Sequence, residues 1–461
     1  WSSDVCSSDL DIILIITNCD IMNLKTLKIF VEGYGCTLNT ADTNIIINSI
    51  NKFKNFIIVN NLDDADIVVI NTCVVRLETE HKMISRINYI KSLNKNIVIT
   101  GCMPKALKKK AEKTNPDILV MPKEAHLTGD MIYNHFKNNM GIKVEADMGR
   151  RELHHSFTNH NDMDNKLAQL KPNNLIMPLP IAEGCTGKCT YCIVKIARGR
   201  LDSYTPNKII NKAKEFADNG VKQMLITSQD TACYGFDKNT TLPILVNEIC
   251  QINGDFNIRI GMMHAKNVPE IIDELIECYK NNKITKFFHL PIQSGDDDVL
   301  KAMKREYTVD EYMDIAMEFK RKIKDLNFNT DIIVGFPTET EDNFNNTIEL
   351  LKKLKPDAIH GAKYSQRKGT EADRLKQVDT KIRKERMKIL DKLRKEFSLK
   401  NHEKYVGKIM PCLIVGENEG ITHNCKTVKF ENCQNVKIGE FRKIKIKEAL
   451  TFGLFGDIIN N

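Results

Sequence analysis

Short apolar segments alternate with longer amphipathic segments through the first third of the chain. The segments TLKIFVEGYG, DIVVINTC and KNIVITGC are rich in β-branched residues and bounded by polar ones, as buried strands are. Helix-like stretches lie between them, beginning with residues 40–53. Strands separated by helices predict a parallel sheet that is covered on both faces. We therefore expect residues 22–149 to form an α/β domain.

A longer series of the same kind comes after a polar stretch. We interpret residues 150–174, which are rich in His and Asn, as a linker. Six apolar segments then alternate with helix-like segments up to residue 366, namely LIMPLPIAEG, QMLITSQD, NIRIGMMH, KFFHLPIQ, TDIIVGFP and AIHGAKYSQ. Six consecutive β/α units predict a parallel barrel, or most of one.

The pattern changes again near the C-terminus. Residues 381–400 form a strongly basic helix-like segment with an apolar stripe of Ile382, Ile389, Leu393 and Phe397. Short alternating segments with Gly between them, such as IMPCLIVGENEG and FRKIKIKEAL, then predict a small all-β domain. We therefore assign residues 175–403 to the barrel with its basic helix and residues 404–461 to the β domain.

Composition narrows the class of protein. A chain of 461 residues exceeds what one core usually supports, so we expect about two or three domains. The 42% hydrophobic and 28% charged residues are typical of a folded globular chain. The longest apolar run, residues 10–17, is too short to cross a bilayer, so we expect no membrane span and a cytoplasmic protein. The net charge of +8 suits a polyanionic partner such as nucleic acid, although solubility explains it equally well.

The first 21 residues differ in pattern from the rest of the chain. They contain a near-repeat, SSDVCSSD, and show no helical or strand-like pattern of apolar residues that continues into the next segment. We interpret residues 1–21 as a non-native leader, with Met22 as the native start.

Fourteen cysteines are many for a chain without a secretion signal, which favours metal ligation or catalysis over disulfides. The segment EGCTGKCTYC places Cys185, Cys189 and Cys192 directly after a predicted strand. Thiolates on such a tight loop can all point at one cubane iron–sulfur cluster, and Gly184 and Gly187 allow the turn. Three ligands leave one iron open to a substrate or cofactor. The alternatives are a zinc site, which usually shows four ligands in pairs, or three unrelated cysteines.

Three further cysteines are far apart in sequence but similar in position. Cys36, Cys73 and Cys102 each come after the end of a predicted strand, in VEGYGC, VVINTC and VITGC. The carboxyl ends of parallel strands meet at one edge of a sheet, where ligands gather. The three thiols could therefore hold a second cluster with an open iron. The alternative is that they are buried core cysteines, which are common.

Several of these segments together resemble the methylthiotransferase family of radical S-adenosylmethionine (SAM) enzymes. The resemblance runs from about Leu27 to the C-terminus and is carried by VEGYGCTLNTADT, INTCVV, TGCMPK, EGCTGKCTYCIVKIARG, SQDTACYG, HLPIQSGDDDVLKAMKR, DIIVGFPTETEDNF and YSQRKGT. It implies an N-terminal methylthiotransferase domain, a radical SAM barrel and a C-terminal TRAM-like domain that grips tRNA.

The resemblance also implies two 4Fe–4S clusters. The open iron of one would chelate SAM, and an electron from that cluster would cleave SAM to methionine and a 5′-deoxyadenosyl radical. The second, auxiliary cluster would present the sulfur that traps the substrate radical, and a further SAM would supply the methyl group. The implied ligands are Cys185, Cys189 and Cys192 for the SAM cluster, and Cys36, Cys73 and Cys102 for the auxiliary cluster.

A few other residues are candidates for the SAM pocket. The resemblance places Tyr191 near the adenine of SAM. Ser228, Gln229 and Gln293 end predicted barrel strands, where polar side chains are expected to hold ligands, although they could instead be strand caps. Arg198, just past the cysteine loop, is expected to meet a substrate phosphate or the SAM pocket, or else to be solvated.

The C-terminal end suits a nucleic acid. Lys443, Lys445 and Lys447 alternate along a predicted strand, so they can present a row of charge to phosphates. Within the family, EGYGCTLNTADT and SQDTACYG look closest to the archaeal and eukaryotic branch. That branch acts on C2 of N6-threonylcarbamoyladenosine next to the anticodon of tRNA. The implied electron donor is of flavodoxin or ferredoxin type.

Three other functions remain open at this point. They are the sister branch that acts on isopentenyladenosine in tRNA, the branch that methylthiolates an aspartate of a ribosomal protein, and an RNA-binding protein whose clusters are only structural. The last would not cleave SAM under reduction.

Overall fold

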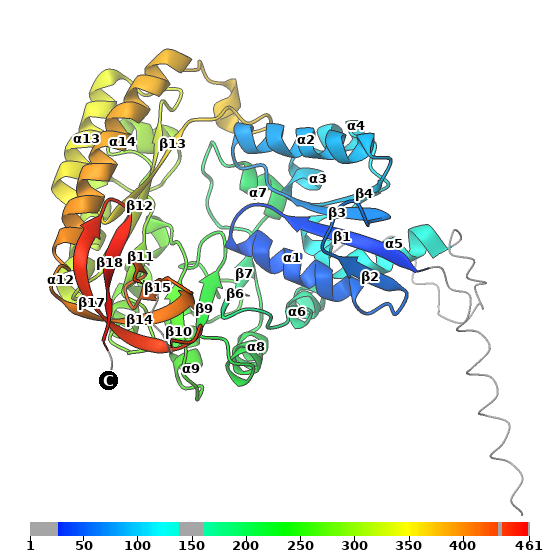
Figure 1. Ribbon diagram of the computed structural model, residues 1–461. Helices are drawn as coiled ribbons and strands as arrows, with labels where there is room; N and C mark the ends of the chain where they lie inside the picture. The colour runs from blue at the N-terminus through cyan, green and yellow to red at the C-terminus, as the bar shows by residue number, and fades with distance from the viewer. Residues whose placement is uncertain (1–25, 138–159, 432–435, 460–461) are drawn as a thin grey trace, which may run out of the picture.

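The structure is a computed structural model that describes residues 26–137, 160–431 and 436–459 (Figure 1). The predicted leader and the first part of the predicted linker lie outside the described residues. No helix within the described ranges is long and apolar enough to cross a membrane.

A five-stranded sheet forms the N-terminal part, in the order β2-β1-β3-β4-β5, and all its neighbours pair in parallel. The central strand β3 is buried along its whole length, as expected for a strand covered on both faces. The strands are β1 (Leu27–Gly33), β2 (Phe56–Val59), β3 (Ile67–Thr72), β4 (Asn96–Gly101) and β5 (Ile118–Leu119). The helices are α1 (Thr37–Ile50), α2 (Leu77–Ser92), α3 (Cys102–Ala106), α4 (Lys108–Lys113) and α5 (Thr128–Phe136).

Six parallel strands then form an open barrel, which confirms the predicted partial barrel and the α/β class. They pair as two three-stranded sheets, β10-β9-β6 and β11-β12-β13, and an isolated bridge between Ile258 and Ile284 lies between the two sheets. The strands are β6 (Ile176–Pro180), β9 (Gln223–Thr227), β10 (Asn257–Ile260), β11 (Phe287–His289), β12 (Asn327–Val334) and β13 (Ala358–Lys363). The helices are α8 (Pro206–Asp218), α9 (Leu242–Cys250), α10 (Ile272–Cys278), α11 (Asp297–Ala302), α12 (Val309–Lys322), α13 (Glu341–Leu354) and α14 (Thr380–Glu403).

Part of the predicted linker is instead a packed helix, α6 (His160–Ala168). Its Met163 and Leu167 are buried in the main core, and Lys166 is fully buried. The few apolar positions of this polar segment recur four residues apart, so they form one side of a helix. The buried lysine is tolerated because it is paired with the carboxylates of Asp42 and Glu183.

Helix α14 packs the second half of its predicted apolar stripe, Leu393 and Phe397, against the core but leaves the first half exposed. Ile382 and Ile389 are 39% and 50% exposed, whereas Leu390 and Phe397 are buried. Arg386 is buried on the same face and pairs with Glu339 at 2.6 Å. This ion pair fixes the rotation of the helix, which the spacing of apolar residues alone could not show.

The C-terminal part is a closed barrel in the order β14-β15-β16-β18-β17, which confirms the predicted all-β domain. It is joined to the parallel barrel at the amino ends of that barrel's strands. Lys426 pairs with Asp357 at 2.9 Å, and the side-chain amide of Asn327 donates to the carbonyl of Asn424 at 2.7 Å. The strands are β14 (Ile409–Gly416), β15 (Glu419–Thr422), β16 (Thr427–Lys429), β17 (Phe441–Leu450) and β18 (Gly453–Ile458).

Candidate functional site

Cys185, Cys189 and Cys192 lie on one tight loop between β7 (Ala182–Glu183) and α7 (Ile193–Arg198), and all three are partly exposed. The backbone N–H of Gly187 donates to Cys185 Sγ at 3.2 Å. Lys195, in the next helix, closes the loop by donating to the carbonyl of Gly187 at 2.7 Å. Cys192 is the N-cap residue of that helix. The three predicted thiols therefore lie on one short, locally closed loop.

A buried polar layer from the parallel barrel supports this loop. The Asp230 carboxylate accepts hydrogen bonds from the backbone N–H of His264 at 2.9 Å and from Asn267 Nδ2 at 2.7 Å. His264 Nε2 lies 3.7 Å from Cys189 Sγ. Arg305 Nη1 donates to the same sulfur at 3.5 Å. Neither Arg305 nor His264 was among the site residues predicted from the sequence, although both lie in segments that predicted the barrel or carried the resemblance.

The electrostatics of the loop fit a metal–thiolate site. Burial raises the pKa of Cys185 to about 12, and the Asp230 carboxylate adds to the effect. Burial also raises the pKa of Cys192. A nucleophilic cysteine needs a lowered pKa, so these thiols are poor nucleophiles. A bound metal displaces the thiol proton, and three convergent sulfurs are the donor set of a 4Fe–4S cluster with one open iron.

The second set of thiols gathers at the edge of the N-terminal sheet. Cys36 caps α1, Cys73 comes after β3 and Cys102 begins α3, so the three lie at the ends of the adjacent strands β1, β3 and β4. Gly35 has φ +118°, and a Cβ there would lie 3.1 Å from Cys73 Sγ. Only glycine fits this close approach. The structure thus brings together three cysteines that are distant in sequence.

The pKa values of this second set also reflect their proximity. Burial raises the pKa of Cys102 to about 11, and the neighbouring Cys36 and Cys73 raise it further. Burial likewise raises the pKa of Cys73, with Cys36 adding to it. Cys36 is exposed, whereas the other two are buried. Three neighbouring thiols, one of them exposed, are a donor set that fits a second cluster.

The side chain of Asn39 contacts all three segments that carry the second set of thiols. Its Nδ2 donates to the carbonyls of Tyr34 at 2.7 Å and Thr72 at 2.9 Å, which fixes the turns that carry Cys36 and Cys73. Its Oδ1 accepts a hydrogen bond from Arg198 Nη2 at 2.6 Å and lies 3.8 Å from Cys102 Sγ. A single amide therefore touches every segment of the site.

Arg198 belongs to a buried charge tetrad that links the two thiol sites. It pairs with Asp42 at 2.6 Å and Glu183 at 3.2 Å, and Lys166 pairs with Asp42 at 2.7 Å and also with Glu183. Each of these four side chains is at most 2% exposed, so every charge depends on its partners. Burial opposes ionisation of Glu183, but Lys166 and Arg198 outweigh it and hold its pKa well below the usual range.

This position of Arg198 corrects our expectation of a phosphate or SAM contact. Arg198 is the last residue of α7, whose cap is Cys192, and α7 packs against α3, which begins with Cys102. The helix and the tetrad therefore set the distance between the two thiol sites. The partners of Arg198 come from α1 and β7, which are distant in sequence, so the local sequence around Arg198 could not predict these contacts.

The residues predicted to hold SAM lie in the same barrel. Tyr191 is partly buried, with its ring edge-to-face against Phe336 at 6.4 Å. Ser228 is buried and accepts a hydrogen bond from a backbone N–H two residues later at 3.2 Å. Gln229 Oε1 is buried without a hydrogen-bond partner among the described residues. Gln293 has φ +81° where the chain leaves β11. Their role in SAM binding stays a prediction.

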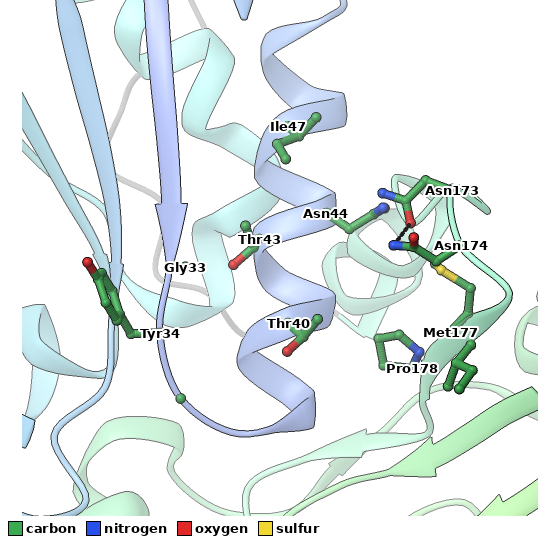
Figure 2. Close-up of a pocket in the computed structure, with 12 residues that line it drawn as sticks. Gly33, Tyr34, Thr40, Thr43, Asn44, Ile47, Asn173, Asn174, Met177 and Pro178 are labelled. Carbon is green, nitrogen blue, oxygen red and sulfur yellow. Dashed lines mark hydrogen bonds between the residues drawn. The ribbon is translucent and has the colours of Figure 1, made fainter. Parts of the chain in front are cut away.

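A pocket of about 240 Å³ lies elsewhere, between α1 and β6 (Figure 2). Its lining includes Gly33, Thr40, Asn44 and Asn174, but none of the residues that we predicted for the site. Figure 2 shows Asn173 and Asn174 hydrogen-bonded to each other at its rim. The thiol sites are therefore not in this pocket.

The comparisons with known proteins agree with the two thiol sites. Residues 179–351 match the Radical SAM superfamily, and residues 28–121 match the uncharacterized protein family UPF0004. These two segments contain the two sets of cysteines. The first match thus covers the loop thiols and the second covers the thiols at the sheet edge.

Relatives extend the match to nearly the whole chain. Over 434 residues the chain is 57% identical to a Methanocaldococcus jannaschii protein named "probable threonylcarbamoyladenosine tRNA methylthiotransferase", and 94% of this chain and 97% of that protein are covered. It is 30% identical over 457 residues to a Bacillus cytotoxicus protein named "tRNA-2-methylthio-N(6)-dimethylallyladenosine synthase", with 94% and 86% covered.

A solved structure supports the fold. The radical SAM methyltransferase TsrM from Kitasatospora setae aligns with a TM-score of 0.53 and 9% identity, over 73% of this chain and 72% of that chain. At such low identity the likeness concerns the architecture only.

Proposed function

The chain belongs to the tRNA methylthiotransferase family of radical SAM enzymes, and we propose that it adds a methylthio group to C2 of N6-threonylcarbamoyladenosine next to the anticodon of tRNA. The observation that carries the proposal is the pair of three-thiol sites held at a fixed separation by α7 and the buried tetrad. Methylthio transfer needs both a radical source and a sulfur source beside one substrate, and the two sites would provide them.

The chain's own residues have separate tasks in this proposal. Cys185, Cys189 and Cys192 would hold the cluster that binds SAM, while Cys36, Cys73 and Cys102 would hold the auxiliary cluster. When bound, the clusters supply the electron that cleaves SAM and the sulfur that is transferred. The buried tetrad holds the two sets of thiols at a fixed separation.

Arg305 would act at the SAM cluster. Its Nη2 donates to the carbonyl of Pro291 at 2.6 Å and its Nε to Tyr307 Oη at 2.7 Å, so the guanidinium is held rigidly with Nη1 on Cys189 Sγ. A fixed guanidinium there would give a cysteine sulfur that ligates a cluster a charged hydrogen-bond donor.

The partner tRNA would be gripped by the C-terminal domain. Lys443 and Lys445 are exposed on β17, with the buried Ile444 between them, and neither forms an ion pair with a described residue. Lys447 on the same strand pairs with Asp457. Phosphate contacts from such a face give affinity without reading bases. We further propose a cytoplasmic location and an electron donor of flavodoxin or ferredoxin type.

The choice of nucleoside agrees with the relatives. The chain is 57% identical to a relative named for threonylcarbamoyladenosine and 30% identical to one named for dimethylallyladenosine. An in vitro assay tests it: the reconstituted enzyme, SAM and a reductant are incubated with tRNA that carries either modified adenosine, and the nucleosides are analysed by mass spectrometry. We expect the 2-methylthio product only from the threonylcarbamoyl tRNA. Product only from the isopentenyl or dimethylallyl tRNA would contradict the proposal.

A further inference from the structure

Three polar side chains on the inner face of the parallel barrel take no part in either thiol site. They are His289 on β11, Asp331 on β12 and His360 on β13, which we call the lumen cluster. His289 Nε2 lies 2.7 Å from an Asp331 oxygen, and the two imidazole rings meet edge-to-face at 5.3 Å. One nitrogen or oxygen atom of each residue lies within 4.8 Å of the others.

Strand alternation places this cluster inside the barrel. Phe288, next to His289, stacks on Phe319 of the outer helix α12 with ring centroids 3.9 Å apart. Gly361, next to His360, faces Leu390 of the outer helix α14. Successive side chains of a strand point to opposite faces, so both histidines point into the lumen.

The lumen at this level is open and polar. The side chains of His289 and Asp331 are 18% and 26% exposed, and His360 is exposed. Phe287 lies beside His289 at 6.3 Å, with the Arg259 guanidinium 5.0 Å from its ring. Arg259 Nε is buried, and no group in the described part of the chain hydrogen-bonds to it. Apolar branched side chains normally fill such an interior, so polar groups facing open space indicate a ligand.

Arg76 of the N-terminal part approaches this cluster from the auxiliary site. It stands three residues after Cys73, is exposed, and forms no ion pair within the described ranges. Arg76 is the N-cap residue of α2, and Glu80 in the first turn of that helix pairs with Arg367 at 2.7 Å, so the start of α2 lies against the segment that follows β13.

We propose that the lumen cluster, together with Arg76, binds the threonylcarbamoyl substituent of the substrate adenosine. This inference rests on the proposed function. The substituent carries a carboxylate, a hydroxyl and two ureido N–H groups. Arg76 and the His360 N–H suit the carboxylate, since charged hydrogen bonds are strong and Arg fits a carboxylate with two donors. Asp331, held by His289, suits the hydroxyl or a ureido N–H.

The same subsite would exclude an apolar substituent. An isopentenyl group offers no hydrogen bond, so it would desolvate Arg76 and Asp331 without replacing their water. Sites built to bind polar groups reject analogues that lack them far better than apolar pockets reject polar analogues. The subsite would therefore explain selectivity for the threonylcarbamoyl nucleoside in terms of this chain's own residues.

Competition by small molecules tests the carboxylate contact directly. The holoenzyme is assayed with free N6-threonylcarbamoyladenosine and with its methyl ester as competitors of tRNA. We expect the wild type to bind the free acid about 10- to 100-fold more tightly than the ester, the effect of one or two charged hydrogen bonds. In Arg76→Met and His360→Phe this preference should shrink to about 3-fold or less, whereas His360→Gln, which keeps a donor, should retain more of it.

Matched controls separate the possible outcomes. Arg321→Met removes an exposed arginine of α12, 67% exposed, and should leave the preference unchanged. A wild-type preference that survives in Arg76→Met and His360→Phe would overturn the subsite but not the proposed function, provided that threonylcarbamoyl tRNA is still methylthiolated. A wild type that never acts on that tRNA would overturn both. A divalent metal that co-purifies in stoichiometric amount and is lost in His360→Phe would assign the cluster to that metal instead.

Discussion

The two thiol sites are built in different ways. Cys185, Cys189 and Cys192 share one loop, which a lysine of the next helix closes. Cys36, Cys73 and Cys102 come from three strand ends, and their edge is held by Asn39 and by charges from other elements. The first set of thiols comes from one continuous segment. The second set comes together only when β1, β3 and β4 have paired. Changes far from the cysteines should therefore damage the second site more than the first.

The largest effect should come from the loop itself. Replacing Cys185, Cys189 and Cys192 together by Ala should abolish SAM cleavage and lower the iron content from about eight to about four per chain after anaerobic reconstitution. Iron analysis and assay of 5′-deoxyadenosine check both. A wild type that saturates near four irons would mean that the sheet edge holds no cluster.

A substitution outside both sets of cysteines should affect the thiols at the sheet edge more than the loop thiols. Lys166→Met leaves Asp42 and Glu183 buried with one cation fewer, which should cost about 3–5 kcal/mol of the free energy of unfolding. We expect loss of auxiliary iron and a fall in methylthio product, with 5′-deoxyadenosine formation less affected. Spectroscopy of each cluster, together with both product assays, measures this difference.

Lys426→Met is the matched control for that experiment. It also removes a buried lysine, but from the ion pair with Asp357 at the opposite end of the parallel barrel. It should lower stability to a similar extent while both clusters stay occupied. Equal loss of auxiliary iron in the two variants would show that general destabilisation, and not the tetrad, is responsible.

The smallest effect should be at the C-terminal domain, which belongs to neither site. Lys443→Ala with Lys445→Ala should weaken tRNA binding and lower the log–log salt dependence by up to about one unit per lost contact, similarly for different tRNAs. Lys447→Ala should add less, because Lys447 is already paired with Asp457. Affinity and slope that match the wild type would move the RNA contact to the mouth of the parallel barrel.

The same contrast explains how far the sequence could predict the molecule. The cysteine loop and the six barrel strands can be inferred from local spacing and periodicity, and the structure has them where they were expected. The family suggested by the motifs is confirmed by 57% identity over nearly the full chain.

What local patterns missed are contacts between distant elements. Helix α6 was hidden in a polar stretch because Lys166 is buried only by virtue of its partners on α1 and β7. Helix α14 is rotated by the Arg386 pair, so Ile389 is exposed. His264 and Arg305 reach Cys189 through the packing of barrel loops, and only Arg305 lay in a segment that carried the family resemblance and could have drawn attention to it.

The most direct test of two separate thiol sites is a product count in Cys36→Ala. 5′-Deoxyadenosine and the 2-methylthio nucleoside are measured in the same reaction with threonylcarbamoyl tRNA, SAM and reductant. Because the loop thiols remain intact, we predict continued formation of 5′-deoxyadenosine and no methylthiolated nucleoside. Methylthio product at the wild-type rate would contradict the account, since Cys36 would then have no part in sulfur transfer.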